Sequence, residues 1–164
     1  MTDTRKPLLI VEDDPALQKQ MVWAFDKYET IVASDHATAI AQVRRFEPAV
    51  VTMDLGLPPQ PDDPTEGLKL LAELHALVPE TKVIVLTGQN DRANALKAIS
   101  LGAHDFCTKP FEPELLTWTI DRAFRVHAGV ARFMDLAGVN FTGVRAGVNF
   151  AGIRRRMDFS GIRA

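Results

Sequence analysis

The sequence predicts an α/β fold, a doubly wound parallel sheet of five strands. Two observations lead to this prediction. Five short apolar runs alternate with amphipathic stretches between residues 8 and 127. The runs are almost continuously apolar, which is typical of parallel strands that are buried on both faces. Because strands that alternate with helices form right-handed crossovers, we expect helices on both faces of the sheet.

The expected strands are the apolar runs at residues 8–11, 30–33, 49–53, 83–86 and 105–108. Apolar residues at helical spacing mark the stretches that follow them, as at Leu17, Met21, Ala24 and Phe25. Further helices are expected at residues 36–46, around 68–78, around 95–99, and from about 112 to at least 126. We expect Trp23 and Trp118, on the first and last helices, to serve packing.

Composition indicates an ordinary globular protein of the reducing cytoplasm. Hydrophobic residues make up 46% of the 164 residues, and no apolar run approaches the roughly 20 residues that span a bilayer. A single cysteine, Cys107, excludes an intrachain disulfide. The net charge is −2, but residues 129–164 hold six Arg and two Asp, so this tail carries +4 and the rest carries −6.

Polar side chains stand where the expected strands end. Glu12 and Asp13 follow the first strand and Asp54 the third, whereas Thr87 follows the fourth and Lys109 the fifth. In open parallel sheets the functional crevice lies beyond the carboxyl ends of the strands. We therefore expect these carboxylates, the hydroxyl and the ammonium group to meet at one edge.

This set of groups suits phosphoryl chemistry. Crowded carboxylates need a cation, and oxygen ligands without His or Cys favour a hard ion such as Mg²⁺. The metal, the ammonium group and the hydroxyl would hold a tetrahedral dianion beside an Asp that accepts a phosphoryl group. The alternative, that each polar residue only caps a strand or helix, is reasonable for single positions such as Asp14 before Pro15. It is a poor account of the whole set.

Residues 6–127 resemble the response-regulator receiver domains of bacterial two-component systems. The resemblance rests on four motifs in the family's order: Leu-Ile-Val-Glu-Asp-Asp at 9–14, Val-Thr-Met-Asp-Leu at 51–55, Val-Leu-Thr-Gly at 85–88 and Thr-Lys-Pro-Phe at 108–111. It implies the flavodoxin-like strand order 2-1-3-4-5. It also implies a signalling switch rather than a metabolic enzyme, which catalyses only its own phosphorylation and slow dephosphorylation.

The resemblance also implies roles for single residues. Asp54 would accept the phosphoryl group from a sensor histidine kinase or phosphotransfer protein, with Thr87 and Lys109 contacting it. The implied ligands of Mg²⁺ are Glu12, Asp13, Asp54 and the carbonyl of Gly56. Thr87 and Phe106 would form the switch, and Lys109-Pro110 a cis peptide bond. A homodimer through the fourth helix, fifth strand and fifth helix would fit the family.

One loop departs from the family pattern. Twelve residues separate Asp54 from Gly67, several more than in most receivers, and the excess is rich in Pro and Asp. Such a loop could tune access to the site or the choice of partner, although we favour a tolerated surface insertion. It resembles loops in relatives of enhancer-binding transcription activators. No ATPase phosphate-binding loop or DNA-binding domain is recognisable here, so this kinship would make the chain a fragment or a truncated relative.

We assign residues 1–128 to the receiver domain and 129–164 to a basic tail. The tail contains four units that resemble pentapeptide repeats, at 134–138, 139–143, 148–152 and 157–161. These are too few for an independent solenoid, so a separate domain is not expected.

Two other functions remain open from the residues alone. A receiver-like interaction module with an unused pocket is disfavoured by the complete set of acids. A Mg²⁺-dependent phosphohydrolase is disfavoured because Gly56 stands two residues after Asp54, where such enzymes carry a second acid.

Overall fold

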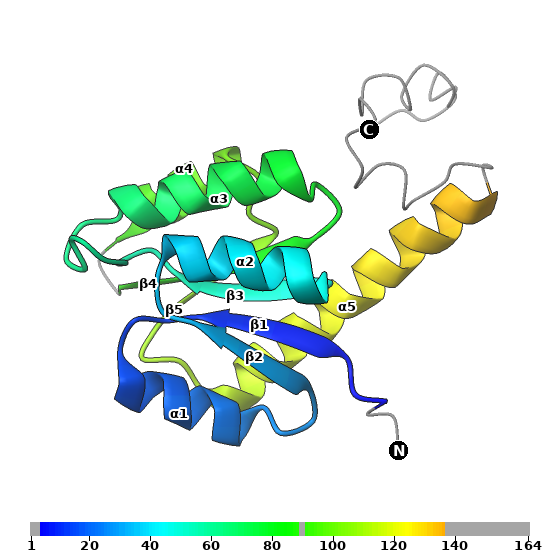
Figure 1. Cartoon of the computed structure of the whole chain (residues 1–164), viewed down its shortest axis with the longest axis horizontal. Coiled ribbons are helices and arrows are strands. Elements are labelled where there is room, and N and C mark those ends of the chain that lie inside the picture. The colour runs from blue at the N-terminus through cyan, green and yellow to red at the C-terminus, as the bar shows by residue number, and fades with distance from the viewer. Residues whose placement is uncertain (1–3, 89–90, 137–164) are drawn as a thin grey trace.

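A computed structural model of the chain describes residues 4–88 and 91–136. Within these ranges a five-stranded parallel sheet in the order β2-β1-β3-β4-β5 is flanked by five helices (Figure 1). The strands are β1 (Pro7–Val11), β2 (Glu29–Ala33), β3 (Val50–Asp54), β4 (Lys82–Gly88) and β5 (Asp105–Lys109). The helices are α1 (Pro15–Ala24), α2 (His36–Phe46), α3 (Thr65–Leu77), α4 (Arg92–Ser100) and α5 (Pro113–Leu136). The predicted fold class and strand order are confirmed.

Alternate residues of the central strands fill two separate cores. Leu8 and Ile10 of β1 face α1 and α5, and Leu9 and Val11 face α2 and α3. All four side chains are buried, as the period of two along a strand requires when helices cover both faces. Figure 1 shows the result as three layers, with α2, α3 and α4 on one face and α1 and α5 on the other.

Aspartate caps start α1 and α2, the helices that follow β1 and β2. The Asp14 carboxylate accepts a hydrogen bond from the backbone N–H of Ala16 at 3.0 Å, and Pro15 is the first residue of α1. At α2, Asp35 accepts from the N–H of Thr38 at 2.8 Å, which lowers the pKa of Asp35. These caps supply acceptors for backbone N–H groups that have no partner within the first turn of each helix.

Helix α5 is anchored at its first half and continues beyond the sheet (Figure 1). Tyr28 donates a hydrogen bond to Asp121, and its ring stacks on Phe124 with 5.4 Å between centroids. Phe124 is the last buried residue of α5 among those described. The helix nevertheless runs to Leu136, so the domain end expected at 128 falls inside it. The repeat-like units from 137 onward lie outside the described residues.

The expectation that both tryptophans serve packing is wrong. Trp23 is 85% exposed and Trp118 is 64% exposed. Each lies two residues, about 200° of helix, from a buried neighbour, Met21 or Leu116, that faces the core. In the described part of the chain, no helix combines the length and apolarity needed to cross a membrane.

Candidate functional site

Polar residues from four strand ends meet at one edge of the sheet. Glu12 follows β1 directly, and Asp54 is the last residue of β3. In the parallel register Asp54 lies beside Leu86 of β4, and Gly88 lies beside Lys109 of β5. The sheet therefore gathers residues that are up to 97 positions apart in sequence, as in the contact between Lys109 and Glu12.

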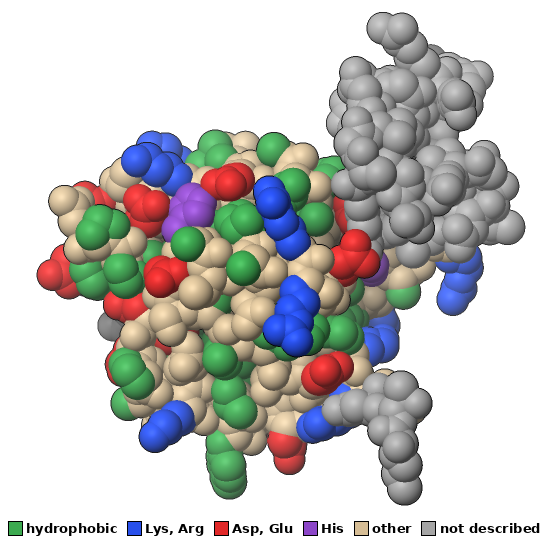
Figure 2. All heavy atoms as spheres, in the orientation of Figure 1, with side chains coloured by type: hydrophobic (Ala, Val, Ile, Leu, Met, Phe, Trp, Pro, Cys, Tyr) green, Lys and Arg blue, Asp and Glu red, His purple; other side chains and the backbone are tan. Residues whose placement is uncertain are grey.

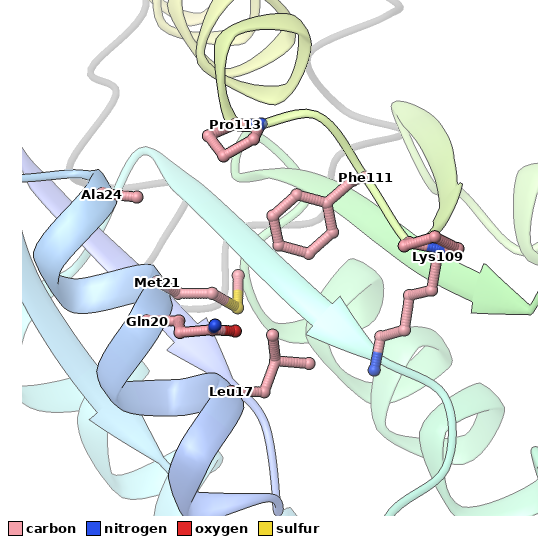
Figure 3. Close-up of a pocket in the computed structure, with 8 residues that line it drawn as sticks. Leu17, Gln20, Met21, Ala24, Lys109, Phe111 and Pro113 are labelled. Carbon is pink, nitrogen blue, oxygen red and sulfur yellow. The ribbon is translucent and has the colours of Figure 1, made fainter.

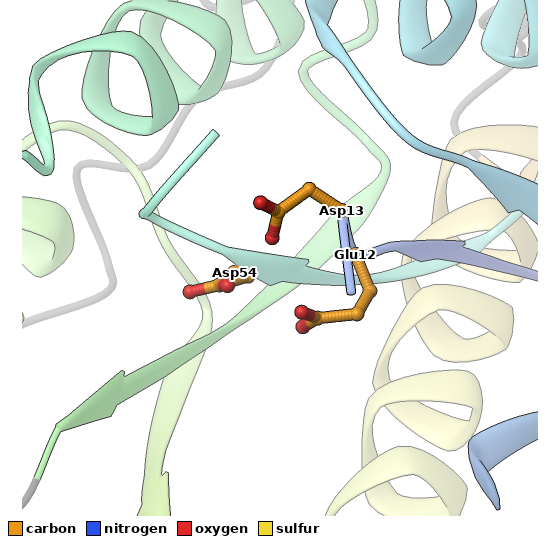
Figure 4. Close-up of side chains that lie close together, drawn as sticks. All are labelled: Glu12, Asp13 and Asp54. Atoms are coloured by element: carbon orange, nitrogen blue, oxygen red, sulfur yellow. The ribbon is translucent and has the colours of Figure 1, made fainter. Parts of the chain in front are cut away.

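Three carboxylates form the centre of the site. Glu12, Asp13 and Asp54 each place one oxygen within 4.8 Å of the oxygens of the other two (Figure 4). Glu12 is almost fully buried, and Asp13 and Asp54 are partly exposed. Figure 4 shows Asp13 and Glu12 projecting from the end of β1 on either side of Asp54. Three acids so close together require positive charge nearby.

Lys109 supplies one such charge. Its Nζ lies 3.1 Å from Oε2 of Glu12 and 3.1 Å from Oδ2 of Asp54. Burial and the negative charge of Asp54 raise the pKa of Glu12 to about 7, although Lys109 opposes this shift. Burial alone would lower the pKa of Lys109, but the charges of Asp54 and Glu12 raise it. Lys109 therefore remains protonated at neutral pH, when Glu12 is near its midpoint.

Asp54 and Thr87 share the other side of the site. The backbone N–H of Gly56 donates to Oδ1 of Asp54 at 3.2 Å. The hydroxyl of Thr87 is buried and has no hydrogen-bond partner among the described residues. A buried hydroxyl without a partner costs free energy, and a bound ligand with acceptor oxygens would satisfy it.

The donor set fits a hard divalent cation. Three carboxylates with oxygens within 4.8 Å of one another match the ligands that Mg²⁺ takes in proteins. His and Cys, which would favour zinc, are absent from the cluster among the described residues.

A pocket of about 160 Å³ opens beside Asp54 and Thr87. The loop between β3 and α3 forms one wall of it, and the start of α4 contributes to the rim. The charged residues that line it are Asp54, Asp62, Asp63 and Asp91. The sequence pointed to the loop by its composition, but it gave no signal for Asp91, which lies in no motif.

A second cavity, of about 420 Å³, has Lys109 in its lining (Figure 3). Leu17, Met21 and Ala24 of α1 face Phe111 and Pro113 across it. Lys109 borders this cavity as well as the acidic site, so the lysine connects a largely apolar surface with the carboxylates.

The remaining predicted residues lie at β5 and its neighbours. The Lys109-Pro110 peptide bond is cis, as is Pro58-Pro59. The ring of Phe106 is 37% exposed on β5. Large apolar side chains are also exposed nearby on α4 and α5, namely Leu96, Ile99, Leu115 and Trp118.

Comparison with known proteins gives matches over most of the chain. The pattern of the family described as response regulator receiver domain matches residues 8–121. The transcriptional regulatory protein DctD of Pseudomonas aeruginosa, named for C4-dicarboxylate transport, is 32% identical over 127 residues. The chemotaxis protein CheY of Thermotoga maritima is 28% identical over 120 residues, which are 71% of this chain and 96% of CheY. The match to DctD takes in 76% of this chain but only 26% of DctD.

Solved structures give the same result. The receiver domain of NtrX from Brucella abortus has a TM-score of 0.67 and 29% sequence identity to this chain. The similarity covers 72% of this chain and 98% of that domain.

Proposed function

This chain belongs to the response regulator receiver family, whose members are phosphorylation-dependent switches of two-component signalling, and we propose that Asp54 is its phosphoacceptor. The observation that carries the proposal is that Asp54 has both a cation and an unpartnered hydroxyl group near it. Lys109 lies 3.1 Å from its Oδ2, and the unpartnered hydroxyl of Thr87 lines the same pocket.

The proposed step is a phosphoryl transfer that this domain assists with its own residues. A carboxylate oxygen of Asp54 attacks the phosphorus of a phosphohistidine on a sensor kinase or phosphotransfer protein. The P–N bond breaks, its electron pair stays on the imidazole nitrogen, and an acyl phosphate forms. Lys109 and Thr87 contact the phosphoryl oxygens and stabilise their charge. Slow attack by water later releases inorganic phosphate and restores the carboxylate.

Mg²⁺ is the proposed cofactor, held by Glu12, Asp13, Asp54 and the carbonyl of Gly56. When bound, it would neutralise the charge that accumulates as a dianion approaches the carboxylates. Glu12, one of these proposed ligands, is held in place by hydrogen bonds from Lys109 and from the N–H of Asp14, the latter at 3.3 Å.

The output is proposed to run through Thr87 and Phe106 to the surface of α4, β5 and α5. A hydrogen bond from Thr87 to the new phosphoryl oxygens would draw its loop inward and give the Phe106 ring space to turn in. The exposed apolar residues on this surface support a partner-binding or homodimer role. A kinase or phosphotransfer protein has a separate apolar surface available in the cavity between α1 and Phe111.

Intact mass measurement tests the central assignment. Incubation with Mg²⁺ and acetyl phosphate or phosphoramidate is expected to add one phosphoryl group, which Asp54→Asn abolishes. Asp13→Ala should weaken Mg²⁺ binding severely. The control, Asp26→Asn, removes an exposed carboxylate that lies just before β2, at the amino ends of the strands and away from the proposed site. Labelling that survives Asp54→Asn would refute the assignment.

A further inference from the structure

The long loop between β3 and α3 is packed against the domain and hydrogen-bonded to it. Leu57 is fully buried in the core, and the N–H of Gly67 donates to the carbonyl of Leu55 at 3.2 Å. Asp63 accepts a hydrogen bond from the N–H of Thr65, the first residue of α3, at 2.7 Å. The loop is thus tied to the sheet at its start and to the helix at its end.

The middle of this loop packs directly against Gly56, which lies two residues after Asp54. A Cβ atom on Gly56 would stand 2.1 Å from the carbonyl oxygen of Pro61. Only glycine allows this approach, because no side-chain carbon is found so near a backbone oxygen. Pro61 and the two residues after it consequently form a wall of the pocket that holds Asp54 and Thr87.

The wall is negatively charged. Asp62 and Asp63 line the pocket from the loop, and Asp91 lines it from the start of α4. No Lys or Arg is among the described residues that line it. Hydrogen bonds from Thr65 lower the pKa of Asp63, so this carboxylate keeps its charge throughout the neutral range. In Figure 2 acidic and hydrophobic side chains share the protruding left edge, where Figure 1 places this loop.

We propose that the loop of residues 57–64 makes the pocket selective against small, freely diffusing anionic phosphodonors. The carboxylates of Asp62, Asp63 and Asp91 repel each negative charge that such a donor brings to the rim. This inference rests on the proposed function of Asp54. The unpartnered hydroxyl of Thr87 in the same pocket marks where an anion would bind.

A protein-bound phosphohistidine is affected less by the same rim. Docking on the domain positions the phosphoryl group, and the binding free energy of the two surfaces offsets local repulsion. Among the described residues, the apolar cavity between α1 and Phe111 shares no lining residue with the pocket beside Asp54, so a docked partner need not contact the acidic wall. The loop would thereby favour transfer from a partner protein over labelling by metabolites.

Two donors of different charge provide the test. At neutral pH acetyl phosphate is a dianion, whereas phosphoramidate carries one net negative charge. The variant Asp62→Asn/Asp63→Asn removes two charges from the wall, and an Asn side-chain oxygen still accepts the hydrogen bond from Thr65. Asp26→Asn is the charge control. Each protein is kept at a Mg²⁺ concentration well above its own saturation, because rim carboxylates also attract the cation.

The double variant should be labelled by acetyl phosphate about three- to tenfold faster than the parent at low ionic strength, with a smaller gain for phosphoramidate. The gain should shrink towards nothing at an ionic strength of about 0.5 M, where screening is nearly complete. Unchanged rates, equal gains with both donors, or a gain that persists at high salt would overturn the proposal. Absence of labelling in every protein, the parent included, would instead refute the assignment of Asp54.

Discussion

The ammonium group of Lys109 lies 3.1 Å from the carboxylate of Asp54. The same nitrogen lies 3.1 Å from Glu12, so one cation is shared between the residue proposed to react and a buried acid beside it. An opposite charge at this distance stabilises both ionised carboxylates. It would equally stabilise a phosphoryl group that forms on Asp54.

Lys109→Ala is therefore expected to slow labelling of Asp54 by roughly 100-fold, as the loss of one stabilising donor does in other transfer sites. Mg²⁺ affinity should not fall at a pH well above the pKa of Glu12, because a competing cation has been removed from carboxylates that are ionised there. Single-turnover labelling and a Mg²⁺ titration measure the two effects. Lys19→Ala, an exposed lysine on α1, is the matched control. Parallel loss of labelling and Mg²⁺ binding would indicate a structural role instead.

Mg²⁺ binding should depend on pH through Glu12. Its pKa is raised to about 7, so the side chain is largely protonated at pH 6 and ionised at pH 8. Because the metal binds the ionised form, the affinity should be about tenfold weaker at pH 6 than at pH 8. Isothermal titration at both values checks this. Glu12→Gln should bind more weakly overall and lose the pH dependence; an unchanged slope would exclude Glu12 as its source.

The close contact of α3 with the end of β3 predicts a contrast between two glycines. A Cβ on Gly67 would stand 2.3 Å from the carbonyl oxygen of Leu55, whereas a Cβ on Gly129 would meet no atom within 4 Å. Gly67→Ala should lower the free energy of unfolding by about 2–3 kcal/mol because backbone must move. Gly129→Ala should raise it by about 0.5–1 kcal/mol, since alanine favours a helix. Urea unfolding measures both, and equal effects would contradict the described packing.

Thr87→Ala should separate phosphorylation from its output. The variant keeps Asp54 and Lys109, so labelling should continue, although more slowly. The change in amide exchange on α4, β5 and α5 that phosphorylation causes in the parent should be lost, because nothing then draws the loop after β4 inward. Exchange changes confined to α1 and α2 in the parent would rule out this route.

The sequence predicts those features of the site that follow from periodicity and strand ends. Glu12 directly follows the buried strand β1, Asp54 ends the buried strand β3, and Lys109 ends the partly exposed edge strand β5. A parallel sheet must bring such positions to one edge. The bridging position of Lys109 depends on its side-chain conformation, which no pattern encodes. The contact between Pro61 and Gly56 depends on an irregular loop, whose composition gives no conformation. The exposure of Trp23 and Trp118 depends on which face of the helix each occupies, and a position on a helix does not by itself place a side chain in the core.

The projecting half of α5 gives the domain a lever arm. Leu136 lies twelve positions beyond Phe124, where the helix leaves the core. At about 1.5 Å per residue this arm is about 18 Å long, so a tilt of about 10° moves its end by about 3 Å. A small rearrangement beside Asp54, passed through β5 to the anchored half of α5, would thus arrive at Leu136 as a displacement comparable to the width of an atom.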